Sequence, residues 1–163
     1  MQQLPHTIIL RHRRENLNKC SLRGLESRSD FLFFRYPSDI LPDLNNYILL
    51  TLDAPPLTKN DAPHGLFILD STWRYAETMS RSIPHPEKML ARSLPPDFRT
   101  AYPRRQDDCL DPERGLASIE AIFAAYVILG RDTAGVLDLY YWKEDFLEKN
   151  KVLLDFYGYK IYY

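Results

Sequence analysis

Gly65-Leu-Phe-Ile-Leu-Asp-Ser-Thr-Trp-Arg-Tyr-Ala76 is the stretch that decides the fold, because an apolar run ends there in a carboxylate, two hydroxyls and a tryptophan. Leu66 to Leu69 shows no polar alternation, which is typical of a strand buried on both faces in a parallel sheet. The three polar residues favour a helix start, and helix formers follow from Trp73 to Ser80. A strand, a polar corner and a helix form the junction at which open α/β sheets bind ligands. A plainer interpretation makes Asp70 a helix cap and Trp73 a core residue.

Length and composition indicate one globular domain. The 163 residues and the apolar fraction of 45% suit a single core, and we expect an α/β fold with a mostly parallel sheet between helices on both faces. The chain has no run of eighteen apolar residues and no signal-peptide pattern, which predicts a cytoplasmic protein with no membrane partner. Cys20 and Cys109 are far apart and the four histidines are irregularly spaced, so we expect free thiols and no metal site.

The charge is unevenly distributed, although the formal net charge is only −1. Arginine and lysine outnumber acidic residues in the segments 11–28 and 74–105, whereas the segment 107–155 is acidic. If the two basic segments share a face, that face can hold a polyanion such as RNA. Scattered, solvated arginines explain the same pattern. Both interpretations stay open from the sequence.

Three further strands are predicted before the pivotal one, at residues 7–12, 30–36 and 47–53, where β-branched and aromatic residues gather. Residues 57–64 are compatible with a short helix or a loop. Residues 81–115 are largely irregular and punctuated by proline, and a loop of that length with interleaved arginine and apolar residues favours an ordered binding loop.

The C-terminal half is predicted to be helical. Ser118 to Leu129 is the most apolar helix candidate, and Gly130 follows it in the expected terminating position. Asp132 can cap a further short helix that runs through Leu139. Helical spacing gathers apolar residues on one side from Trp142 to Tyr157, which predicts one amphipathic surface helix. The last five residues are compatible with a strand or a frayed tail.

The usual catalytic motifs are absent. The chain contains no glycine-rich dinucleotide motif, no P-loop, no G-x-S-x-G elbow and no H-E-x-x-H. Without a strong nucleophile or a metal, the sequence favours a reaction driven by a reactive small molecule.

Six segments carry a resemblance to a known family. Asp70-Ser-Thr-Trp73 resembles a D-x-[ST]-W signature, and the other segments follow in matching order: Asn18–Leu22, Arg92–Pro95, Ala101–Pro103, Leu116–Ala121 and Trp142–Asn150. Together they resemble the small-subunit rRNA aminocarboxypropyltransferases, which share the signature with the DTW-domain tRNA-uridine aminocarboxypropyltransferases. The chain departs from the family pattern at Tyr102, which replaces an asparagine, and at Lys143, which replaces a glycine. Arg104–Asp108 replaces a glycine-containing turn and adds several residues.

The resemblance implies S-adenosyl-L-methionine as cofactor and a SPOUT-like fold with a deep trefoil knot. It implies transfer of the 3-amino-3-carboxypropyl group to N3 of a (methyl)pseudouridine or uridine in small-subunit ribosomal RNA. Residues 1–64 would then face the RNA and residues 65–163 would form the knotted cofactor-binding region. The implied partner is ribosomal RNA or the pre-ribosomal small subunit. The resemblance also implies that the chain acts as a monomer. Two alternatives are a SPOUT-type RNA methyltransferase and a non-catalytic RNA-binding assembly factor.

The family also implies roles for single residues. Trp73 and Ala76 would wall off the cofactor's methyl group, and Asp70 would position the nucleobase or help to take its N3 proton. Glu120 would contact the amino group of the transferred chain, or would merely occupy the first turn of a helix. Ser21 would meet the ribose hydroxyls. The remaining cofactor contacts would come from Leu52, Leu69, Leu94, Leu116 and Ala117, and the RNA contacts from Arg11, Arg13, Arg14, Lys19, Arg99, Arg104 and Arg105.

Overall fold

A computed structural model describes residues 3–14, 21–103 and 115–161, and the chain forms two compact units. The first unit comprises Met1–Pro55 and Pro63–Ser93, and the second comprises Pro56–Ala62 and Leu94–Tyr163. The functional division predicted after residue 64 stays a prediction, and the two compact units are divided at other positions. That the whole chain is a single domain stays a prediction.

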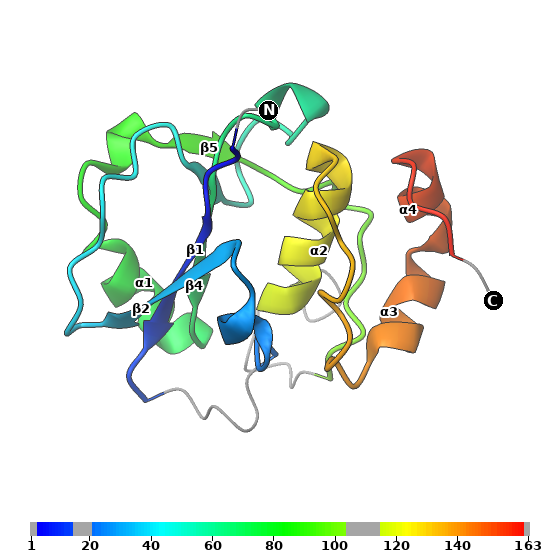
Figure 1. Cartoon of the computed structure of the whole chain (residues 1–163), viewed down its shortest axis with the longest axis horizontal. Helices are drawn as coiled ribbons and strands as arrows, with labels where there is room; N and C mark the ends of the chain where they lie inside the picture. The colour runs from blue at the N-terminus through cyan, green and yellow to red at the C-terminus, as the bar shows by residue number, and fades with distance from the viewer. Residues whose placement is uncertain (1–2, 15–20, 104–114, 162–163) are drawn as a thin grey trace. The chain divides into compact units, whose positions relative to one another are not determined.

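The first unit is built on a five-stranded sheet in the order β2-β1-β4-β3-β5, in which every neighbouring pair is parallel. Figure 1 shows these strands with α1 beside them. The parallel sheet predicted from the uninterrupted apolar runs is therefore confirmed. The strands are β1 (Thr7–His12), β2 (Phe31–Tyr36), β3 (Ile48–Leu50), β4 (Leu66–Asp70) and β5 (Leu90–Arg92).

The two central strands carry the core of this unit. All six residues of β1 are buried, and Leu66 and Phe67 of β4 are inaccessible to solvent. Helix α1 (Trp73–Ser80) contacts β4, and its Met79 joins the cluster that forms on β1 and β4. Burying one such side chain contributes about 1.5–3 kcal/mol. The predicted helix at 73–80 is confirmed, whereas cover on the second face of the sheet stays a prediction.

Two strand predictions need correction. β3 is shorter than the predicted 47–53, because the chain bends at residues 52–54, ahead of two prolines that cannot donate to a ladder. β5 was missed inside the segment predicted to be irregular. It has only three residues and pairs with β3 alone, so no periodicity could mark it. Short 3₁₀ helices complete the unit as η1 (Leu25–Ser27) and η3 (Pro86–Lys88).

The second unit is organised around α2 (Ser118–Leu129), which confirms the predicted helix. Most of its residues are buried, and Gly130 ends it in the left-handed region at φ 74°. The segment 57–64, which the sequence left open, contains a 3₁₀ helix, η2 (Lys59–Asp61), that contacts α2. Thr58 and Asp61 cap η2 reciprocally through their side chains.

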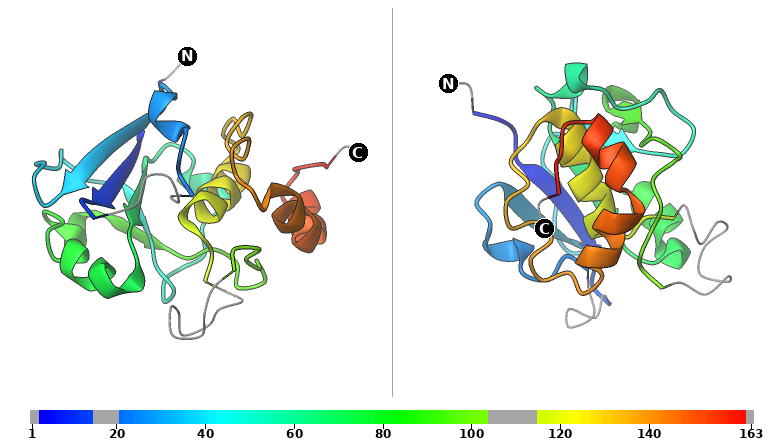
Figure 2. Two further views of the ribbon diagram at one scale, coloured as in Figure 1. Left: turned by 90° about the horizontal axis from the view of Figure 1, so that it is seen from below. Right: turned by 90° about the vertical axis from the view of Figure 1, so that its right-hand side faces the viewer.

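Two helix predictions in this unit are wrong. The helix expected from Asp132 to Leu139 is a series of turns, because Gly135 lies in the left-handed region at φ 80° and so interrupts a helix three residues after Asp132. The helix expected from Trp142 to Tyr157 divides at Asn150 into α3 (Lys143–Lys149) and α4 (Lys151–Phe156). Figure 2 shows α3 and α4 in succession.

Asn150 causes the division because its side chain is held from outside the helix. It is 2% exposed, its Oδ1 accepts from the Arg99 N–H at 2.8 Å, and its Nδ2 donates to the Arg99 carbonyl at 2.9 Å and the Phe146 carbonyl at 2.8 Å. The C-terminal residues 159–161 have no regular structure, although the Tyr159 ring packs edge-on against Phe123 at 5.1 Å.

Candidate functional site

The corner after β4 places Asp70 against β1. Asp70 is the last residue of β4 and lies beside Arg11 in the parallel register, because carboxyl ends of parallel strands meet at one edge. Its Oδ2 accepts from Arg11 Nε at 3.2 Å, and the two residues are only 5% and 8% exposed. Thr72, two residues after Asp70, is the N-cap residue of α1, and its side chain makes no cap hydrogen bond. The plainer interpretation of Asp70 as the helix cap is therefore wrong.

Arg11 is shared by two carboxylates. Its Nη1 donates to Glu26 Oε1 at 3.1 Å, and its guanidinium lies 4.7 Å from the centre of the Phe33 ring. Burial raises the pKa of Glu26, but hydrogen bonds from its own N–H, from Arg11 and from the Gly24 N–H outweigh burial and lower it. Arg11 is thus engaged by two carboxylates inside the unit, whereas Arg13 and Arg14 are exposed.

His12 joins the end of β1 to α1. The ring is 8% exposed and stacks on Tyr75 with a centroid distance of 4.0 Å, and its Nδ1 accepts from the Arg14 N–H at 3.1 Å. Burial, followed by the charges of Arg14 and Arg13, lowers the pKa of His12. Sequence reasoning considered His12 only as a metal ligand and missed this role. The signal was its position, at a strand end directly before two arginines.

The other predicted residues of the first unit differ in exposure. Leu69 of β4 and Ala76 of α1 are half-buried on either side of the corner, and Ser21 is half-buried in a turn. Trp73 is the first residue of α1. Leu52 is 88% exposed after β3, so it offers little enclosure to a ligand within this unit.

Glu120 is the centre of the second unit's site. It is fully buried in the first turn of α2. Its Oε1 accepts from Thr100 Oγ1 at 2.6 Å and the Ala117 N–H at 2.8 Å, and its Oε2 accepts from the Ala101 N–H at 2.8 Å and Tyr140 Oη at 3.0 Å. Four donors use most of the acceptor capacity of one carboxylate. Glu120 therefore ties three segments together.

The motif segments of this unit meet around that carboxylate. Leu116, half-buried, and Ala117, 3% exposed, directly precede α2. The Tyr102 N–H donates to Thr100 Oγ1 at 2.9 Å, and the Tyr102 ring lies edge-on to Trp142 at 5.1 Å. Three of the segments that carried the sequence resemblance thus form one cluster.

Arg99 and Leu94 complete the predicted residues of the second unit. Both are half-buried, and the Arg99 guanidinium donates to the carbonyls of Pro96 at 2.6 Å and Phe98 at 3.1 Å. Three other predicted RNA contacts, Lys19, Arg104 and Arg105, lie outside the described residues. Within the described ranges, no group of three His, Cys, Asp or Glu side chains could hold a metal ion. No helix in the same ranges is long and apolar enough to cross a membrane.

Comparison with known proteins finds likeness in structure rather than in sequence. No protein-family model matches the chain, and no curated protein matches it. Among solved structures, the chain is similar to the SAM-dependent rRNA:acp-transferase Tsr3 from Vulcanisaeta distributa, with a TM-score of 0.71 and 24% identity over 95% of this chain and 83% of that one. At this identity the likeness establishes a shared α/β fold.

Proposed function

We propose that the chain is an RNA-modifying transferase that moves the 3-amino-3-carboxypropyl group of S-adenosyl-L-methionine to N3 of a (methyl)pseudouridine or uridine in small-subunit ribosomal RNA. The observation that carries the proposal is the TM-score of 0.71 to a protein described as a SAM-dependent rRNA:acp-transferase. The six motif segments in the chain point to the same family independently of the fold.

The chemistry of the first site fits such a ligand. The first site offers an apolar residue, Leu69, and a small one, Ala76, beside a helix start with no side-chain cap, and such a start exposes N–H donors. When bound, the cofactor supplies a sulfonium whose neighbouring carbons are open to displacement. The transfer would form an N3–C bond as the C–S bond of the aminocarboxypropyl chain breaks, with the electron pair leaving on methylthioadenosine and the N3 proton passing to solvent.

The residues of the chain would bind and orient the reactants. Trp73 and Ala76 would shield the methyl group from the base. Because the base attacks only the sulfonium carbon that faces it, this shielding would favour transfer of the aminocarboxypropyl group over transfer of the methyl group. By the family resemblance, the further cofactor contacts would come from Ser21, Leu52 and Leu69 in the first unit and from Leu94, Leu116 and Ala117 in the second.

The two buried carboxylates are best described as positioning residues. Asp70 is held by Arg11 at the strand end, so it would fix the corner rather than move freely towards a base. Glu120 is occupied by four donors, so it would shape the loop around Ala101 rather than reach the amino group of the cofactor.

The RNA would meet exposed cations. Arg13 and Arg14 are exposed beyond β1, and Lys19, Arg104 and Arg105 belong to the same predicted set. We further propose a deep trefoil knot within residues 65–163, a distant relation to the DTW-domain enzymes, and a monomer that acts in the cytoplasm on ribosomal RNA or the pre-ribosomal small subunit.

Titration calorimetry and mass spectrometry test this function. The purified chain should release heat with S-adenosyl-L-methionine, and incubated small-subunit RNA should gain the mass of an aminocarboxypropyl group while methylthioadenosine accumulates. A methyl mass with S-adenosylhomocysteine would show a methyltransferase instead. RNA binding without cofactor heat or added mass would show a non-catalytic assembly factor.

A further inference from the structure

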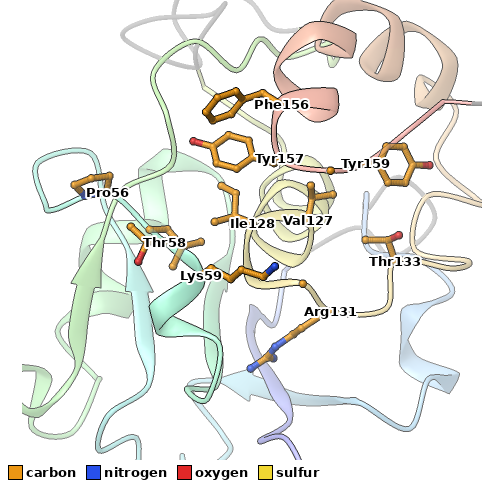
Figure 3. A pocket seen from close by; sticks show the side chains of 13 residues that line it. Pro56, Thr58, Lys59, Val127, Ile128, Arg131, Thr133, Phe156, Tyr157 and Tyr159 are labelled. Atoms are coloured by element: carbon orange, nitrogen blue, oxygen red, sulfur yellow. The ribbon is translucent and has the colours of Figure 1, made fainter.

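A pocket in the second unit is lined by residues other than those assigned above. It has a volume of about 720 Å³, within the range of ~300–1,000 Å³ typical of ligand pockets. Its lining comes from three segments: η2 with the residues before it, the end of α2 with its following turn, and the end of α4 with the residues after it. Figure 3 shows these side chains around one space. None of the residues predicted to bind the cofactor lines it.

The pocket is positively charged. Its described lining residues include Lys59 and Arg131 but no aspartate or glutamate. The carboxylate of Asp61 in η2 is buried and accepts from the Thr58 N–H at 3.1 Å. The end of α2 carries about half a negative charge, which cannot neutralise two unit cations. An anionic ligand is therefore favoured.

The two cations are presented differently. Arg131 is half-buried; its Nη2 donates to the Ala62 carbonyl at 3.4 Å and its guanidinium lies 5.7 Å from the Tyr126 ring centre. These contacts fix Arg131 at the edge of the pocket. Lys59 is exposed, and Figure 3 shows its amine beside the end of α2. An exposed ammonium is a compact point charge, which suits a phosphate group.

Aromatic rings line the opposite side. Phe156 is 78% exposed and lies edge-on to Tyr157 with a centroid distance of 5.1 Å. Gly158, at φ 95°, turns the chain after α4 so that the Tyr159 N–H donates to the Leu154 carbonyl at 2.9 Å. That turn holds the Phe156–Tyr157 pair at the pocket. Exposed aromatic rings beside cations are the arrangement by which proteins bind unpaired bases and their phosphates.

We propose that this pocket binds one nucleotide of single-stranded RNA, with a phosphate against Lys59, on the side of the pocket that also carries Arg131, and the base against Phe156 and Tyr157. The choice of RNA over other anions rests on the proposed function. A nucleotide held in this pocket would add affinity for the RNA and would fix the position of the strand on the second unit.

Fluorescence anisotropy with a labelled single-stranded RNA of mixed sequence tests the proposal. Phe156→Ala should weaken binding by about fivefold to hundredfold, the usual range for loss of one stacked base. Lys59→Ala should weaken binding and reduce the slope of log affinity against log salt by roughly 0.7, as expected for one phosphate contact on a single strand. Lys160→Ala and Tyr141→Ala change an exposed lysine and an exposed tyrosine outside the pocket, and both should bind like the wild type.

Inorganic polyphosphate separates stacking from charge. Lys59→Ala should weaken polyphosphate binding, whereas Phe156→Ala should leave it unchanged. The proposal is overturned if both pocket variants bind RNA with wild-type affinity and salt slope, or if Phe156→Ala weakens polyphosphate as much as RNA.

The cofactor assay distinguishes this proposal from the proposed function. All four variants should release the same heat of binding as the wild type when they are titrated with S-adenosyl-L-methionine. This result would also show that the variants are folded. If aminocarboxypropyl transfer is absent but RNA affinity still falls in the two pocket variants, the pocket assignment stands without the proposed function. If transfer occurs and the pocket variants bind RNA normally, only the pocket assignment fails.

Discussion

Asp70 in the first unit and Glu120 in the second are buried carboxylates that solve the same physical problem in different ways. Asp70 lies beside a cation, Arg11, which it shares with Glu26. Glu120 receives four hydrogen bonds from neutral donors. A buried charge must be paired or fully hydrogen-bonded, and each unit uses one of these solutions.

The difference indicates what each cluster responds to. The Arg11 cluster depends on charge balance, because removing the cation leaves a buried carboxylate uncompensated. The Glu120 cluster depends on hydrogen bonding, because each of its four donors needs one of the two carboxylate oxygens as its acceptor. Substitutions that change charge should therefore affect the first unit most, and isosteric substitutions that change hydrogen bonding should affect the second.

Arg11→Met should have the largest effect. It removes the cation beside buried Asp70, and breaking a buried ion pair by loss of one partner costs about 3–5 kcal/mol. Urea denaturation measures the free energy of unfolding. Arg13→Met, at an exposed arginine two residues away, should change it by less than about 0.5 kcal/mol. Equal effects of the two substitutions would contradict the pairing.

Glu120→Gln should cost about 2–3 kcal/mol despite its similar size. In either orientation of the new amide, its NH2 group replaces an oxygen that accepted two hydrogen bonds. The donors that lose their acceptor are then Thr100 Oγ1 and the Ala117 N–H, or the Ala101 N–H and Tyr140 Oη. Chemical denaturation of this variant beside Glu148→Gln, an exposed position on α3, measures the loss. A Glu120→Gln protein as stable as the control would show that acceptor geometry does not decide this cluster.

Gly130→Ala should cost about 1 kcal/mol or slightly more, because its φ of 74° places an added Cβ in the left-handed region. The substituent itself meets ordinary contact at 3.8 Å from Lys59 Cε, so backbone strain is the cause. Gly130→Asn should cost less, since asparagine tolerates this conformation. Thermal unfolding ranks the three proteins, and an alanine variant as stable as the asparagine variant would remove strain as the reason for this glycine.

His12 should give the smallest effect, visible only through pH. Its pKa is lowered in the folded state, so its neutral form stabilises the fold fully above the unfolded value of about 6.5. That contribution is lost as the pH falls below 6.5 towards the folded pKa. Unfolding free energies at several pH values should therefore decline more steeply in the wild type than in His12→Asn. Parallel curves would show that His12 does not carry this dependence.

The sequence predicts the parts of the fold whose signals are local. Strand β4 and helix α2 have continuous apolar runs with clear ends, at Asp70 and at Gly130, and both were predicted within a residue or two. The polar corner after β4 was also identified, because three polar residues follow an apolar strand.

The missed features depend on partners far along the chain. The sequence alone suggests that Arg11 is a surface cation, because its partner Asp70 lies 59 residues later in the chain. Helical spacing continues through Asn150, and only the bonds to Arg99, 51 residues away, explain the division there. The donors to Glu120 from Thr100 and Tyr140 each lie 20 residues away, so its first-turn position alone could not reveal them.

One labelling measurement tests the proposed function most directly. Small-subunit RNA is incubated with the chain and S-adenosyl-L-methionine that carries one isotope in its carboxyl group and another in its methyl group. The account predicts that the carboxyl label enters the RNA while the methyl label stays in methylthioadenosine. Entry of the methyl label without the carboxyl label, or of neither label, would contradict it.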